Sequence, residues 1–221
     1  MTASTAHIDH WIFDLDNTLY PPSARLFDLI DDRMRAFIMR LLKLDADEAH
    51  RVQKDYFHRY GTTMAGLMRH HDVAPEDFLV DVHAIALDRI APDLRLRAAL
   101  EKLPGKRYIY TNADADYAAR VLEARGISDL FHGMCDIRIT QYIPKPVTSS
   151  YDMMLAHLGV DPSRSLFFED MARNLSPAKA LGMMTVWLDN GSESGHRDHV
   201  PDHVDFRIND LTDWLESLPQ Y

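Results

Sequence analysis

The sequence predicts a doubly wound α/β fold, built on a mostly parallel, Rossmann-like sheet with an inserted all-helical cap domain. Short apolar runs of the length of buried strands occur near the start of the chain and again throughout its second half. Helical segments separate the later runs, as expected of parallel strands joined by crossover helices. A long segment with only helical periodicity lies between the first strand and the others. We therefore predict a core over residues 1–19 and 100–221 and a helical cap over 20–99.

The first predicted strand ends in a cluster of carboxylates. The apolar run Trp11–Phe13 is followed by Asp14 and Asp16, which indicates a short buried strand whose carboxyl end reaches the surface. In open α/β sheets, ligands bind outside this end of the strands. The two acidic residues therefore occupy a position suited to a functional site.

The segment that follows the first strand is patterned for helices up to about residue 100. Apolar residues recur at three- and four-residue intervals between Leu26 and Leu41, which predicts an amphipathic helix. Proline-containing breakers at 72–75 and 90–93 divide the rest of the segment. Further helices are expected at about 46–60, 63–70 and 75–87. Together these helices predict a compact insert.

Strand patterns return in the second half of the chain. We predict strands at 107–110, 165–168, 183–187 and 204–207, and a weaker one at 133–137. Helices are expected at about 114–125, where Gly126 ends the pattern, at 174–181, and after the last strand. This alternation completes the predicted core.

Composition and charge limit the classes of partner. The 24 Lys and Arg residues against 34 Asp and Glu residues give a formal net charge of -10, which repels nucleic acid polymers and anionic membranes at long range. A small phosphorylated metabolite remains compatible, because a bound cation can reverse the potential within one pocket. Only one cysteine, Cys135, is present, so no internal disulfide can form. With no run of about 18 apolar residues, these features predict a cytoplasmic protein that does not span a membrane.

Four separate positions, most of them predicted strand ends, carry the groups that phosphoryl transfer needs. Such a reaction requires a nucleophile, a proton donor for the leaving oxygen, a cation and donors for the phosphoryl oxygens. Each position alone has an ordinary structural explanation, such as a helix cap, a solvated loop lysine or an acidic helix start. Their order along the chain favours a shared site. The residues are Asp14 and Asp16, Thr111 and Asn112, Lys145, and Glu169 and Asp170.

The segment Phe13-Asp14-Leu15-Asp16-Asn17-Thr18 resembles the first signature of the haloacid dehalogenase superfamily phosphatases, an Asp-x-Asp-x-Thr after the first strand. By this resemblance Asp14 is the nucleophile that forms an aspartyl-phosphate, and it is also a metal ligand. Asp16 is the general acid and then the general base for the hydrolytic water, and its backbone carbonyl contacts the metal. The resemblance thus implies a phosphatase that requires a metal ion.

Three later segments resemble the remaining signatures. Thr111 and Asn112 match the second, which binds the transferring phosphoryl group, and Lys145, between two prolines, matches the lysine of the third. The run from Phe167 to Asn174 matches the fourth, so that Asp170 is implied as a metal ligand and Glu169 as a ligand acting through water. Hard oxygen ligands and a phosphate substrate favour Mg²⁺.

Segments outside these signatures resemble the pyrimidine 5'-nucleotidase-like family, namely residues 16–21, residues 60–67 and the pair Val82-His83. The implied substrate is a pyrimidine nucleoside 5'-monophosphate, UMP or CMP. Tyr20, which follows the catalytic turn, and Thr63, in a cap loop, are the candidate substrate contacts. The stretch 82–88 lacks the acidic residue expected directly after the histidine in relatives.

Other activities are compatible with the same signatures. The enzyme alternatives are a broader small-metabolite phosphatase, acting for example on phosphoglycolate, and a phosphomutase. The non-enzyme alternative is a catalytically silent phosphate-binding regulator. The intact set of acids favours catalysis, whereas the core motifs do not separate a hydrolase from a mutase.

Overall fold

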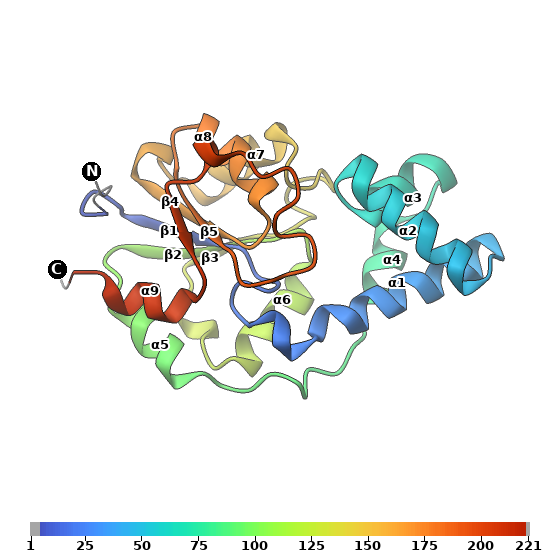
Figure 1. The fold of residues 1–221 in the computed structure, drawn as a ribbon, viewed down its shortest axis with the longest axis horizontal. Coiled ribbons are helices and arrows are strands. Elements are labelled where there is room, and N and C mark those ends of the chain that lie inside the picture. Colours follow the sequence, from blue (N-terminus) through green and yellow to red (C-terminus); the bar gives the residue numbers. More distant parts are fainter. Residues whose placement is uncertain (1–4, 220–221) are drawn as a thin grey trace.

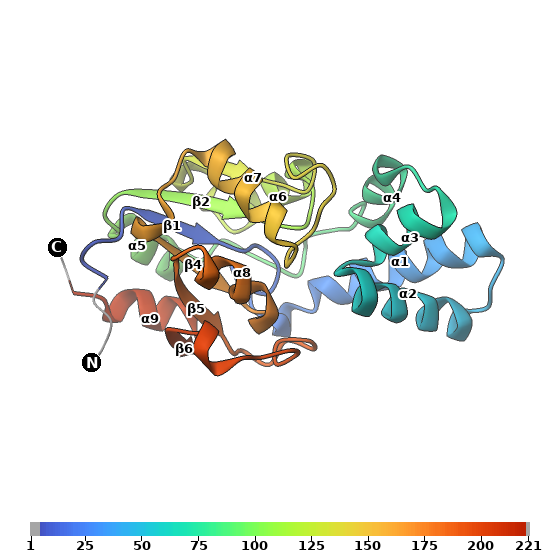
Figure 2. The same ribbon diagram turned by 90° about the horizontal axis from the view of Figure 1, so that it is seen from above.

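The computed structural model describes residues 5–219, which form two lobes (Figure 1; Figure 2). One lobe contains a parallel sheet with helices on both faces, and the other contains helices only. The six strands lie in the order β3-β2-β1-β4-β5-β6. Their bounds are β1 His10–Phe13, β2 Lys106–Tyr110, β3 Gly133–Cys135, β4 Ser165–Glu169, β5 Met184–Leu188 and β6 Phe206–Ile208. The predicted doubly wound α/β fold is confirmed.

The central position of β1 follows from its burial on both sides. Trp11, Ile12 and Phe13 have no exposed surface, and β1 pairs with β2 on one side and β4 on the other. Because side chains alternate along a strand, Trp11 and Phe13 join the core on one face while Ile12 joins the core on the other. The chain that leaves β1 therefore emerges in the middle of the carboxyl edge of the sheet.

Two layers of helices cover the sheet (Figure 1). On one face lie α5 Leu94–Glu101, α6 Ala115–Ala124 and α9 Leu211–Ser217, and on the other lie α7 Thr148–Leu158 and α8 Leu175–Ala180. The weak strand predicted at 133–137 exists, although it ends at Cys135. The sequence patterns did not indicate α7, whose first turn lacks a side-chain cap.

The second lobe is formed by α1 Leu26–Leu42, α2 Ala46–Tyr60, α3 Thr63–His71 and α4 Pro75–Val82. Local caps set the starts of α2 and α3: Asp45 and Glu48 form a capping box at α2, and Thr62 accepts a hydrogen bond from the Ala65 N–H at α3. α4 ends at Val82, five residues before the predicted end of its pattern at residue 87. No helix in the described range is both long and apolar enough to cross a membrane.

The boundary between core and cap that we predict at residues 99 and 100 falls inside α5. This helix packs against α9 on the sheet rather than against the helices of the second lobe. Residues 83–93 run between the lobes as an extended connection with no helix or strand. The exact division into core and cap therefore stays a prediction, and α5 lies with the core.

Candidate active site

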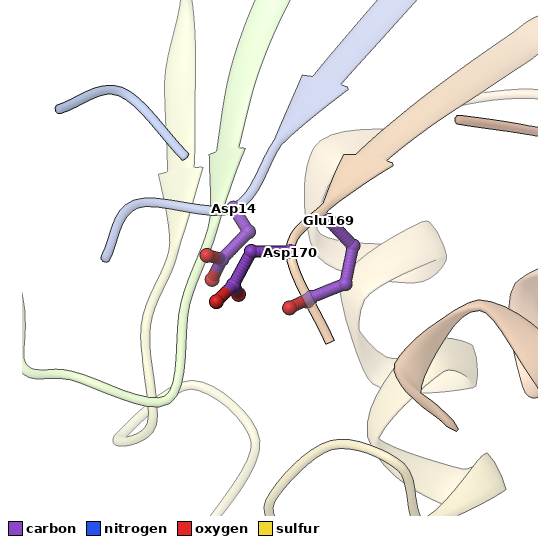
Figure 3. A group of neighbouring side chains, drawn as sticks. All are labelled: Asp14, Glu169 and Asp170. Atoms are coloured by element: carbon purple, nitrogen blue, oxygen red, sulfur yellow. The ribbon is translucent and has the colours of Figure 1, made fainter. Parts of the chain in front are cut away.

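Three carboxylates meet at the carboxyl edge of the sheet (Figure 3). Asp14 follows β1, Glu169 is the last residue of β4, and Asp170 comes next in the chain. One oxygen from each lies within 4.8 Å of the others, and all three residues are buried. Since β1 and β4 are parallel neighbours in register, their ends necessarily bring these side chains together.

A buried lysine lies against this group. The Lys145 ammonium donates to Asp14 Oδ1 and to Glu169 Oε2, at 2.7 Å each, and to the Tyr110 carbonyl at 3.0 Å. Burial alone would lower the pKa of Lys145, but its ion pairs with the two carboxylates outweigh burial and raise it. The side chain is thus held as a cation beside Asp14, although only 1% of its residue surface is exposed.

The carboxylates outnumber the nearby cation by three to one, and their protonation reflects this imbalance. Burial, followed by the charge of Glu169, raises the pKa of Asp14 to about 7. Burial and the charges of Glu169 and Asp14 raise the pKa of Asp170 well above its usual range. A divalent cation with a preference for oxygen ligands would relieve this repulsion, so the donor set fits Mg²⁺.

Both oxygens of Asp14 have protein partners. Oδ1 accepts from Lys145, and Oδ2 accepts from the Thr18 hydroxyl at 3.1 Å. Thr18 lies in the turn after β1, where Asn17 adopts a left-handed conformation with φ of 59°. The Asp-x-Asp-x-Thr segment therefore folds back on itself and fixes the orientation of the Asp14 carboxylate.

Asp16 lies outside the group of three carboxylates and is held by two tyrosines. Its Oδ1 accepts from the hydroxyl of Tyr20 at 2.6 Å and from that of Tyr117 at 2.9 Å. Burial raises the pKa of Asp16, and the two hydroxyl bonds and the nearby His83 oppose that rise. The backbone carbonyl of Asp16 stays a predicted metal ligand, whereas its side chain is turned toward the tyrosines.

Tyr20 does not have the position expected of a substrate contact. Only 1% of the residue is exposed, and it does not contribute to the wall of the cavity described below. The Tyr20 hydroxyl donates to the Asp16 carboxylate, because the turn after β1 brings residues 16 and 20 onto the same side. Tyr20 thus holds Asp16, and a contact between Tyr20 and substrate stays a prediction.

Thr111 and Asn112 follow β2 beside Asp14 and have different partners. The Thr111 Oγ1 atom accepts from the Ala113 N–H at 3.0 Å, which leaves its hydroxyl proton available for a phosphoryl oxygen. The Asn112 side chain accepts from the Lys145 N–H at 2.8 Å and donates to the Lys145 carbonyl at 3.4 Å. Asn112 therefore fixes the backbone that carries the lysine.

A cavity of about 180 Å³ lies between the two lobes, with these groups in its wall. We call it the cap–core cavity. Its wall includes each predicted core site residue and, from the cap, Thr63, whose hydroxyl is already bonded to the Gln53 carbonyl at 3.1 Å. Much of the opposite wall is apolar, formed by Phe27, Ile30, Met34, Phe57, Met64, Phe78, Leu79 and Val82.

The cap also contributes His83, directly after α4. Its Nδ1 atom pairs with the carboxylate of Asp114, the residue that caps α6. The imidazole stacks on the Tyr117 ring with centroids 4.5 Å apart and an interplanar angle of 12°. Sequence reasoning missed Tyr117 and Asp114, and treated His83 only as part of a motif. Two sequence signals could have indicated this pair: a histidine, His83, at the end of a cap helix, and an acid, Asp114, at the start of a helix.

This chain is similar in sequence to known proteins. The chain is 28% identical over 189 residues to phosphate metabolism protein 8 of Saccharomyces cerevisiae, a match that covers 78% of this chain and 59% of that protein. It is 25% identical over 165 residues to the N-acetylmuramic acid 6-phosphate phosphatase of Pseudomonas aeruginosa, covering 73% of this chain and 64% of that protein. The chain thus spans less than two thirds of the length of both relatives.

A crystal structure of a HAD phosphatase from Thermococcus onnurineus has the same fold, with a TM-score of 0.62 and 20% identity. The match covers 95% of this chain and 97% of that chain. The model of the haloacid dehalogenase-like hydrolase family matches residues 8–182, which include β1, the cap and the strand ends of the site. By this match, the chain belongs to the haloacid dehalogenase-like hydrolase family.

Proposed function

We propose that this protein is a Mg²⁺-dependent phosphomonoester hydrolase that forms an aspartyl-phosphate on Asp14. The main support is the position of Asp14, whose carboxylate is fixed by Lys145 and Thr18 in the wall of the cap–core cavity. Glu169 and Asp170 lie beside it and supply further oxygen ligands. When bound, Mg²⁺ would be held by this group and would neutralise charge on the phosphoryl oxygens.

In the first step, a carboxylate oxygen of Asp14 forms a bond to phosphorus while the bond from phosphorus to the leaving oxygen breaks. Asp16 gives its proton to the leaving oxygen, since burial favours its protonated form. In the second step, Asp16 takes a proton from a water molecule that attacks phosphorus, and the Asp14 carboxylate is released with inorganic phosphate. The Thr111 hydroxyl holds a phosphoryl oxygen, and the positive charge of Lys145 beside Asp14 stabilises the charge of the phosphoryl group.

We further propose a pyrimidine nucleoside 5'-monophosphate as substrate. The support is the resemblance of residues 16–21, 60–67 and 82–83 to the pyrimidine 5'-nucleotidase-like family, together with a cavity wall that is apolar opposite the carboxylates. A second candidate is a broader small-metabolite phosphatase, because one relative is named for a sugar phosphate. Both candidates use the same chemistry and differ in the leaving group that the cap accepts.

A substrate panel separates the candidates. Purified protein with Mg²⁺ would be incubated with UMP, CMP, purine monophosphates, phosphoglycolate and hexose phosphates, and released phosphate would be measured. We expect the highest kcat/KM with UMP or CMP. Isomerisation of a hexose phosphate without phosphate release would instead indicate a mutase, and no release from any ester would favour a binding protein.

Millimolar Mg²⁺ is expected to raise Tm by about 5 °C or more, because a ligand that binds the folded state stabilises it by mass action. The raised pKa of Asp14 means that the folded protein binds this proton more tightly than the unfolded chain. The metal-free protein therefore loses stability as pH rises through about 7, and Mg²⁺ restores it there. The Mg²⁺-dependent shift should be larger at pH 8 than at pH 6. Thermal scans with and without Mg²⁺ test this, and Asp170→Asn should show a smaller shift.

Replacing Tyr117 with phenylalanine is expected to lower kcat/KM by about tenfold, because the carboxylate of Asp16 loses a hydroxyl donor and part of its orientation. Steady-state kinetics with the preferred ester provide the measurement. Tyr108→Phe is the matched control, since Tyr108 is also a buried tyrosine but packs in the core on the other face of the sheet. Equal losses in the two variants would contradict a role for the Tyr117 hydroxyl.

A further inference from the structure

The cap wall of the cap–core cavity contains a buried glutamine with an unused acceptor. Gln53, on α2, is 2% exposed and contributes to that wall. Its Oε1 atom has no hydrogen-bond partner among the described residues. A buried acceptor without a partner costs stability, so its presence in a substrate cavity calls for an explanation.

The orientation of the Gln53 amide is set by a neighbouring acid. Its Nε2 group donates to the Asp31 carboxylate at 3.0 Å and to the Asp31 carbonyl at 3.3 Å. Turning the amide over would place Oε1 against these two acceptors, where it would have no donor to bond. Asp31 therefore keeps the nitrogen of the amide engaged and leaves the oxygen free.

Asp31 is itself fixed by a cation. The Lys54 ammonium donates to its second oxygen at 2.8 Å and reaches Glu193 at 3.4 Å. Glu193 belongs to the loop after β5, so this chain of contacts joins the cap to the core at the edge of the cavity. Gln53 is thus the end of an ordered polar network in a cap wall that is otherwise largely apolar, and its buried oxygen has no partner among the described residues.

We propose that Gln53 is a specificity-determining residue whose Oε1 accepts a hydrogen bond from an N–H group of the pyrimidine base in the leaving group. This inference rests on the proposed nucleotidase function. The apolar side chains of the cavity wall suit the faces of a planar base, and uracil N3 and the cytosine amino group are both donors. A base without a donor would leave the glutamine unpaired, so the site should reject it by about 10- to 100-fold in kcat/KM.

The experiment compares UMP with its N3-methyl derivative, which lacks the donor, in wild type and in Gln53→Met. p-Nitrophenyl phosphate, which has no base, serves as the reference ester. Wild type should prefer UMP by about 10- to 100-fold, and Gln53→Met should remove this preference while retaining turnover of the reference ester. Methionine is close to glutamine in length, so a purely steric rejection of the methyl group would persist in the variant and would overturn the proposal.

Arg51→Met is the matched control, since Arg51 is an exposed residue of α2 that does not contribute to the cavity wall, and it should retain the preference for UMP. If Gln53→Met does not fold, the wild-type ratio decides, and equal kcat/KM values for UMP and the methyl derivative overturn the proposal. Turnover of p-nitrophenyl phosphate without turnover of UMP also overturns it, while the phosphatase assignment survives. Absence of turnover of any ester would mean that the proposed function itself has failed.

Discussion

Replacing Asp14 with asparagine is expected to lower kcat by at least about 10³-fold, because the amide cannot form the bond to phosphorus that a carboxylate forms. The fold should persist, since Lys145 keeps its ion pair with Glu169 and its bond to the Tyr110 carbonyl. Burial and repulsion by Glu169 disfavour the charged form of Asp14, so the uncharged amide can be accommodated. Loss of activity with retained structure is the signature of a nucleophile.

The measurement is phosphate release under saturating substrate with Mg²⁺, together with rapid quenching of labelled substrate to detect phosphate covalently bound to the protein. Wild type should carry acid-stable label during turnover, and Asp14→Asn should carry none. Asp152→Asn, at an exposed position on α7, is the control and should behave as wild type. Phosphate release by Asp14→Asn within about tenfold of wild type would rule out the aspartyl-phosphate pathway.

Replacing Lys145 with methionine is expected to lower the free energy of unfolding by about 3–5 kcal/mol in the metal-free protein, because it leaves buried carboxylates without their cation. Asp14 and Glu169 both lose an ion pair of 2.7 Å and stand beside Asp170. Activity should fall together with stability, since the ammonium that faces the phosphoryl group is absent. This is the largest effect on stability that we expect from a single change in the site.

Urea unfolding with and without Mg²⁺ would measure the effect. Lys102→Met, at an exposed lysine after α5, is the matched control and should change stability by less than about 0.5 kcal/mol. Mg²⁺ should recover part of the loss in Lys145→Met, because it supplies positive charge to the same carboxylates. If Lys145→Met were as stable as wild type without Mg²⁺, the carboxylates would not depend on the lysine for their charge balance.

The strand ends of the site were predictable because their pattern is local. An apolar run that stops at a carboxylate marks the end of a buried strand, and parallel strands bring their ends to one edge of the sheet. Asp14, Glu169 and Asp170 meet for this reason. The role of Lys145 was proposed from its flanking prolines and from resemblance, since its loop has no periodicity. The bonds between the Asn112 side chain and the Lys145 backbone were not foreseen.

The helices of the cap were predictable from the sequence, but the part of the cavity wall that they form was not. Amphipathic periodicity indicates which side of a helix is buried without saying what it faces. The apolar stripe of α1 and α4 could have packed wholly within the cap, yet residues such as Phe27 and Val82 also contribute to the cavity. For the same reason Gln53 reads in the sequence as an ordinary polar residue of α2.

By itself, the sequence determined the fold class, the acids at the carboxyl edge and the chemistry that they indicate, because strand periodicity and short motifs depend on neighbouring residues. Only the tertiary structure decided that Tyr20 and Tyr117 hold Asp16, that His83 stacks on Tyr117, and that the buried Gln53 oxygen has no partner among the described residues. Tyr117 lies 101 positions from Asp16. Contacts over such separations arise when the fold brings distant segments together at the edge of the sheet, and they leave no periodic signal in the chain.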